Sequence, residues 1–211
     1  MDLSLNNIWD SWWRFAKGKR QTEELHQFKF ELEKNLFHLH QELNAKKYKH
    51  GTYREFYVSE NKRRKIAVAS IRDRVVHRLI YEYLVEKFDH TFIYDAWSCR
   101  RGKGLLGAIA RSKVYFNRYK DGYVWRTDIS KFFDSVNKKV LLNLLTRKLD
   151  NLWLPEEIIQ SYSSNSPDTG IPIGNLTSQI FANIYMNEID RFVKFHLKAK
   201  AYLRYRSEER R

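Results

Sequence analysis

Two hydrophobic periodicities alternate along this chain, and their order limits the folds that it can adopt. Between residues 22 and 46, leucine and phenylalanine recur at spacings of three and four, which predicts an amphipathic helix. Residues 52–70, TYREFYVSENKRRKIAVAS, alternate apolar and polar side chains around a short polar turn, which predicts a β-hairpin. Helical spacing returns over 71–88 and 104–119. This order of elements is typical of an α+β fold.

The second half of the chain continues the mixture. GYVWRTDISKFFDSV, residues 122–136, begins as an apolar strand that ends at Asp128. Helices are predicted over 137–148, just after Pro155 and again after the loop SSNSPDTGIPIGN, and the late segment AYLRYR has the period of a strand. The chain has 211 residues, 43% of them hydrophobic, with only three prolines and eight glycines. We therefore expect one continuous body with helices packed on a small antiparallel sheet.

The charge balance favours a polyanionic partner. Thirty-nine Lys and Arg residues stand against 25 Asp and Glu residues, which gives a formal net charge of +14. Such an excess attracts nucleic acid or an anionic membrane surface, and charge alone does not distinguish them. No apolar run approaches the length of about 20 residues that spans a bilayer, and the N-terminus lacks a basic signal region. We expect a soluble, cytoplasmic protein without a membrane partner.

Cysteine and histidine usage limits the metal chemistry. The single cysteine, Cys99, excludes an intramolecular disulfide and a zinc site built from cysteines. His38 and His40 are the one ligand-like histidine pair, and solvated helix positions are the favoured interpretation of both.

Asp128 draws attention because it is an acid at the end of an apolar strand. Phosphoryl transfer uses carboxylates in such positions to hold two divalent cations, and Mg²⁺ prefers oxygen ligands. Taken by itself, this pattern is weak, because an isolated aspartate at such a place is commonly a helix cap or a turn acid. Asp134, before the next helix, has that ordinary interpretation.

Several motifs in a fixed order resemble those of reverse transcriptases. WRTDISKFFDSV, then GIPIGNLTSQIFANIYMNEID, then YLRY resemble the palm of enzymes from group II introns, retrons and diversity-generating retroelements. The upstream segments NKRRKIAVASIRDRVVHRLIYEYL and AWSCRRGKGLLGAIAR look like their fingers. The resemblance covers roughly residues 50–205. Ile173 before Gly174, and Ser178 before Gln179, look like the diversity-generating branch, whereas the other branches usually show Pro-Gln-Gly and Ser-Pro.

The resemblance implies a right-hand polymerase fold and assigns roles to individual residues. Residues 1–48 would form a helical N-terminal leader, 49–120 the fingers and 121–211 a partial palm. The implied site residues are Asp128 and the backbone carbonyl of Ile129 as Mg²⁺ ligands, Phe133 as the steric gate against ribonucleotides, Arg64 and Lys62 as triphosphate contacts, and Ile173 with Gly174 beside the incoming nucleotide. For Phe133, ordinary core packing is the competing interpretation.

Ile173 has a chemical consequence of its own. A glutamine at this place would hydrogen-bond near the nucleotide, whereas isoleucine offers only shape and apolar contact. We expect relaxed control of the base pair, which agrees with the error-prone cDNA synthesis that the resemblance implies. The implied partners are template RNA, primer or cDNA, deoxynucleoside triphosphates and a small basic accessory protein.

The chain departs from the family pattern after Tyr205. A Tyr-x-Asp-Asp turn is expected there, yet Ser207 and Glu208 stand in the places of its two acids. We therefore expect a truncated reverse transcriptase with one of three catalytic acids, inactive by itself as a polymerase. Two alternatives are a retron or group II intron enzyme fragment and a non-catalytic RNA-binding module that clamps phosphates with its basic hairpin and Arg100, Arg101 and Lys103.

Overall fold

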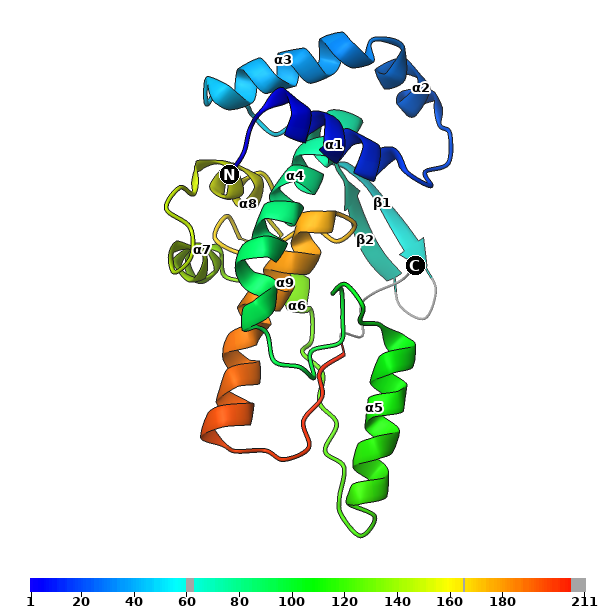
Figure 1. Cartoon of the computed structure of the whole chain (residues 1–211), viewed down its shortest axis with the longest axis vertical. Helices are drawn as coiled ribbons and strands as arrows, with labels where there is room; N and C mark the ends of the chain where they lie inside the picture. The colour runs from blue at the N-terminus through cyan, green and yellow to red at the C-terminus, as the bar shows by residue number, and fades with distance from the viewer. Residues whose placement is uncertain (60–62, 165, 206–211) are drawn as a thin grey trace.

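The computed structural model describes residues 1–59, 63–164 and 166–205. Three N-terminal helices cover one end of the molecule: α1 (Leu5–Ala16), α2 (Glu23–Phe30) and α3 (Leu32–Asn44) (Figure 1). The single helix predicted over 22–46 is interrupted at Glu31, where the backbone leaves helical geometry at φ −113° and ψ 37°. The interruption allows Leu25 of α2 and Leu36 of α3 to reach the same core. The prediction was right about the apolar face and wrong about continuity.

The predicted hairpin is confirmed. β1 (Arg54–Ser59) pairs antiparallel with β2 (Arg63–Val68), with Arg54 opposite Val68 and Ser59 opposite Arg63. These two strands form the one sheet of the described residues. β1 is largely exposed, whereas β2 buries Ala67 completely, because the inner edge of β2 faces the rest of the molecule.

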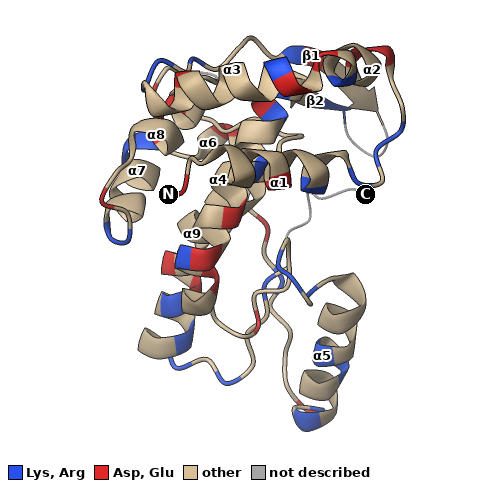
Figure 2. Cartoon of the chain, turned by 45° about the horizontal axis from the view of Figure 1, so that its top comes forward, with Lys and Arg blue, Asp and Glu red and all other residues tan. Residues whose placement is uncertain are grey.

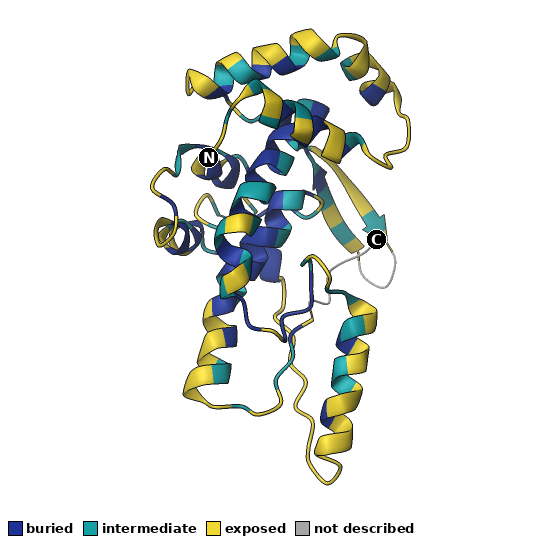
Figure 3. Cartoon of the chain, viewed as in Figure 1, coloured by how far each residue is buried: buried dark blue, intermediate teal, exposed yellow. Residues whose placement is uncertain are grey.

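Two long helices form the centre of the core. α4 (Ile71–Phe88) and α9 (Leu176–Arg191) lie side by side, and α1 packs across α4. Both helices are buried along most of their shared length (Figure 3). The prediction of a helix over 71–88 is confirmed, and Ser70 caps it by accepting a hydrogen bond from the Asp73 amide.

Three shorter helices precede α9 in the chain. They are α6 (Phe132–Ser135), α7 (Lys138–Thr146) and α8 (Trp153–Gln160). α7 packs on α9, and α8 packs on α7. Asn137 caps α7, since its side-chain oxygen accepts from the Val140 amide at 3.0 Å, which confirms the predicted helix start. Asp134 lies within α6.

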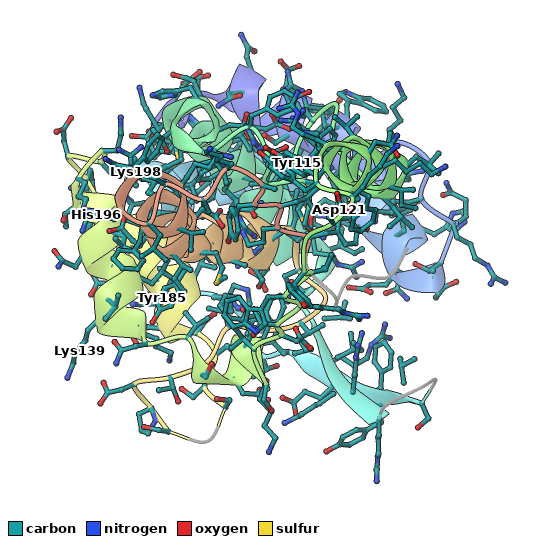
Figure 4. All side chains as sticks on the ribbon, turned by 90° about the horizontal axis from the view of Figure 1, so that it is seen from below. Tyr115, Asp121, Lys139, Tyr185, His196 and Lys198 are labelled. Carbon is teal, nitrogen blue, oxygen red and sulfur yellow. The ribbon has the colours of Figure 1, made fainter. Side chains whose placement is uncertain are left out.

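α5 (Leu105–Arg118) projects away from this body, as does the end of α9 (Figure 1). A short 3-10 turn, η1 (Asp89–Thr91), precedes α5 in the chain, and a π-helical turn, η2 (Phe192–His196), extends α9. Seen from below, Tyr115 and Asp121 lie on the α5 side, whereas His196 and Lys198 lie on the other (Figure 4). α5 meets the body where Gly107 contacts the Trp97 ring so closely that an added Cβ would lie 2.4 Å from Trp97 Cζ3.

The two strands predicted in the second half are not formed. Residues 122–129 carry no strand pairing, and the segment is exposed throughout. A strand is stable only beside a partner, and the described residues supply none for this segment. The described part of AYLRYR, residues 201–205, instead forms one parallel bridge, between Arg204 and Ala96. Across the described ranges, no helix is both long and apolar enough to cross a membrane.

Candidate nucleotide and nucleic-acid interface

The loop that carries Ile173 and Gly174 is fastened to β2. The Ala67 amide donates a hydrogen bond to the Ile173 carbonyl at 2.9 Å. Gly174 adopts φ +114°, and a Cβ there would lie 2.9 Å from Ile66 Cγ2. Glycine is required on both grounds, because L side chains rarely adopt this backbone conformation and the strand leaves no space. The close approach that the structure shows is to β2, and contact of Gly174 with the incoming nucleotide stays a prediction.

A second set of hydrogen bonds ties the same loop to α6. The Ile171 amide donates to the Phe133 carbonyl, and the Gly170 amide donates to the Val136 carbonyl, both at 2.9 Å. The structure thus brings together the backbones of three predicted site segments that lie far apart in sequence. They are β2, the turn around Phe133, and the loop 170–175.

The Phe133 ring belongs to the main core. Its side chain is only 3% exposed, and its ring meets that of Phe132 edge to face with centroids 5.5 Å apart. Core packing, the competing interpretation of this residue, accounts for that burial. The role of Phe133 as a steric gate stays a prediction.

The hairpin presents cations of different kinds. Arg64 is half-buried on β2, Lys65 pairs with Glu55 across the strands at 2.7 Å, and the Arg63 guanidinium lies over the Tyr57 ring at 4.1 Å. An exposed ion pair contributes little stability, and Arg63 and Lys65 are both exposed on this surface. Lys62, the other predicted triphosphate contact, lies outside the described residues, as do Ser207 and Glu208.

α5 adds a second basic surface, the α5 arm, which comprises residues 105–125. Its helix carries Arg111, Lys113 and Arg118 and no acid (Figure 2). Aromatic side chains stand exposed along the arm, including Phe116, Tyr119, Tyr123 and Trp125. Cations interleaved with exposed aromatic rings suit a single-stranded nucleic acid, whose phosphates and bases they contact respectively.

Arg111 also anchors this arm to the body. Its guanidinium donates to both carboxylate oxygens of the buried Asp95, at 2.8 and 3.3 Å, and Tyr115 donates to the same acid at 2.6 Å. Burial works to raise the pKa of Asp95, but the hydrogen bonds from Arg111 and Tyr115 lower it below its ordinary value. The charged acid therefore fixes the root of α5.

Asp128 lies on the exposed segment before α6, and Ile129 beside it is 41% exposed. The predicted strand that would have carried them is absent. Within the described ranges, no group of three or more His, Cys, Asp or Glu side chains gathers as a metal site. Asp128 and the Ile129 carbonyl as Mg²⁺ ligands, and the incomplete two-ion site, stay predictions.

Asn175 was missed by reading the sequence. It precedes α9 in a position typical of a helix cap, yet its side chain makes no cap hydrogen bond. The carboxamide instead donates to the Ala67 carbonyl at 2.7 Å and accepts from the Ala69 amide at 3.3 Å. The only local signal was a polar residue after Gly174 in an otherwise apolar stretch. Such a residue does not indicate which distant groups its side chain will contact.

Comparison with known proteins agrees with the resemblance at a coarse level. LtrA, a group II intron-encoded protein of Lactococcus lactis subsp. cremoris, is 25% identical over 72% of this chain and 28% of its own length. Protein YkfC of Escherichia coli K12 is 23% identical over 77% of this chain and 46% of its own. A COX1/OXI3 intron 2 protein of Saccharomyces cerevisiae is 22% identical over 62% of this chain and 16% of its own. The chain thus spans less than half the length of each of these relatives.

A solved structure has the same fold. A chain of the partial Cas6-RT-Cas1–Cas2 complex aligns with a TM-score of 0.57 and 22% identity, over 92% of this chain and 34% of that one. No protein-family model matches the sequence. These matches confirm a likeness to intron-encoded proteins and a reverse-transcriptase-like fold. The diversity-generating branch, the division into leader, fingers and palm, and the truncation stay predictions.

Proposed function

We propose that the chain forms the nucleotide-binding fingers and part of the palm of a reverse transcriptase, the enzyme class that copies RNA into DNA. The observation that carries this proposal is the hydrogen bond between the Ile173 carbonyl and the Ala67 amide. It joins the basic hairpin to the loop that the resemblance places beside the incoming nucleotide. The intron-encoded relatives support the same reaction class.

The proposed roles follow from charge and shape. In the reaction, the primer 3′-oxygen attacks the α-phosphorus of a deoxynucleoside triphosphate and pyrophosphate leaves. Arg64 would pair with the triphosphate, since a guanidinium forms strong charge-assisted hydrogen bonds to phosphate oxygens. Ile173 would border the nucleotide with an apolar surface. Asp128 would supply one carboxylate to Mg²⁺, with the backbone carbonyl of Ile129 as a further ligand.

The α5 arm would hold the nucleic acid. Its exposed aromatic rings and its cations suit a single-stranded template, and binding of this kind weakens steeply with salt. A phosphate-clamping module without catalysis would show the same salt dependence. Nucleotide binding, which a phosphate-clamping module does not require, therefore distinguishes the two functions.

A photoreactive deoxynucleotide tests the proposal on the chain as it exists. The chain is mixed with a primed RNA whose next template base is uracil, Mg²⁺ and 8-azido-dATP, irradiated, and mapped by mass spectrometry. We expect adducts within 63–68, 128–136 or 170–175, and stronger competition by dATP than by dCTP. Labelling elsewhere, or competition that ignores the template base, would overturn the proposal.

Two matched arginine variants sharpen this test. Arg64→Gln should reduce labelling by about tenfold, because a charge-assisted contact to phosphate is lost. Arg147→Gln is the control, since Arg147 is an arginine at the end of α7 that pairs with Glu188 at 2.9 Å. Equal loss in both variants would contradict a specific role for Arg64.

A further inference from the structure

The carboxamide of Asn175 copies the hydrogen bonding of a neighbouring strand. It donates to the Ala67 carbonyl at 2.7 Å and accepts from the Ala69 amide at 3.3 Å. In a parallel β-ladder, one residue bonds in the same way to the carbonyl and the amide that flank its opposite residue. Asn175 therefore acts as a one-residue strand that lies against Val68.

The position of this contact on β2 is significant. The other edge of β2 is paired with β1. The loop covers the free edge, because Ala67 uses both its backbone groups toward the loop, donating to Ile173 and accepting from Asn175. Backbone groups left unpaired on a buried edge would be costly, so the loop and the strand are held in one register.

The burial of Asn175 makes this contact hard to replace. Its side chain is only 4% exposed, and its neighbour Gly174 permits the close approach that the contact needs. A buried amide with both ends hydrogen-bonded specifies one arrangement, since any slip leaves polar atoms unsatisfied. α9 begins at the next residue, so the clamp also sets where that helix starts relative to the hairpin.

We propose that Asn175 is a positioning residue that clamps the Ile173–Gly174 loop onto β2, so that loop and hairpin present a single rigid nucleotide-contact surface. The consequence for nucleotide binding rests on the proposed function, but the hydrogen-bonded clamp can be tested separately. Asn175 does not touch the nucleotide; it acts through Ile173 and through the strand that carries Arg64.

Amide hydrogen exchange tests the clamp directly. In Asn175→Ala, the Ala69 amide loses its acceptor, and we expect its protection to fall by about tenfold or more. The discriminating amide is that of Ala67, whose acceptor is the Ile173 carbonyl. If Asn175 clamps the loop, Ala67 loses protection as well. If only Ala69 changes, Asn175 merely satisfies one amide and the inference is wrong.

A second variant keeps the test valid where Asn175→Ala fails to fold. Asn175→Asp preserves the acceptor for Ala69 but turns the donor facing the Ala67 carbonyl into a repelling oxygen. At neutral pH, we expect exchange at Ala67 to accelerate in this variant. Unchanged protection at Ala67 in either folded variant overturns the clamp.

Asn44→Ala is the matched control. The Asn44 carboxamide also donates two hydrogen bonds to backbone carbonyls, those of Leu3 and His40, but on the surface of α3. It should leave both hairpin amides protected. Acceleration at Ala67 and Ala69 in this control as large as that in Asn175→Ala would mean that general destabilisation, and not the clamp, opens the loop.

Photolabelling with 8-azido-dATP separates the clamp from the function. With both correct, Asn175→Ala lowers the labelling of the wild-type chain by about fivefold or more while Asn44→Ala does not. If amide exchange accelerates in Asn175→Ala but the wild-type chain takes no label, the clamp is supported and the nucleotide role is wrong. Labelling that survives in Asn175→Ala despite faster exchange removes the positioning role alone.

Discussion

The Nε2 atoms of His50 and His77 lie 3.1 Å apart, and the contact continues through the protein as a chain of hydrogen bonds. The Gly51 carbonyl can only accept, so the Nδ1 of His50 donates to it, at 2.6 Å. With His50 neutral, its Nε2 then accepts from His77, whose Nδ1 accepts from the Thr177 hydroxyl at 2.6 Å. These tautomers, assigned from the network, link the segment before the hairpin to the start of α9.

Because His77 is buried, we expect the free energy of unfolding to fall in mild acid. Burial is the main cause that lowers the pKa of His77 to about 3, and the charge of Arg74 acts in the same direction, against the opposing effect of Asp73. The folded chain therefore keeps His77 neutral while the unfolded chain protonates it below pH of about 6.5. Unfolding free energy should decrease by about 1.4 kcal/mol per pH unit as pH falls from 6 toward 4.5. Urea unfolding at several pH values measures the slope.

The control for that slope is an exposed histidine of α3, His38. His77→Gln should flatten the pH dependence in this window even though it lowers stability at pH 7. A loss of slope in His38→Gln as large as in His77→Gln would show that the buried histidine is not responsible.

Gly174→Ala should destabilise the chain by about 2–4 kcal/mol, because backbone strain adds to the clash with β2. Gly102→Ala is the matched control, since Gly102 also has a positive φ, +68°, but nothing lies within 4 Å of its added Cβ. The control should cost about 1 kcal/mol from strain alone. Thermal unfolding measures both variants, and equal effects would mean that contact with β2 is unimportant.

Arg204→Met should be more damaging still, by about 3–5 kcal/mol, because it leaves a buried carboxylate without its cation. Arg204 is 9% exposed and donates to Asp190, which is completely buried, at 2.9 Å. Arg147→Met removes an exposed pair with Glu188 and should change stability by less than about 1 kcal/mol. Similar midpoints in denaturant for the two variants would refute this ranking.

The purified chain alone should incorporate no nucleotide on a primed RNA template with Mg²⁺. Ser207 and Glu208 stand where the family pattern has its paired acids, and Asp128 alone does not hold two metal ions. A primer-extension gel measures this, with an unrelated active reverse transcriptase as positive control. Robust extension that disappears in Asp128→Asn would show that the chain completes a catalytic centre by itself.

The sequence by itself determined the local elements. Helical spacing at Val75, Leu79 and Ile80 predicted α4 with its correct bounds. Alternation of apolar and polar residues around the polar turn predicted the hairpin. Both patterns are informative because they indicate which face of an element is buried. The helix cap at Asn137 could also be predicted from sequence, since a cap depends only on residues three positions away.

Only the tertiary structure decided what lies against what. Asn175 looks like a helix cap in sequence, and its true partners, Ala67 and Ala69, lie more than 100 positions away along the chain. The strand predicted before Asp128 fails for the same reason, since a strand requires a partner that its own sequence does not name. Periodicity records burial within an element, whereas hydrogen bonds between distant segments depend on how the elements pack, and that packing sets the candidate site.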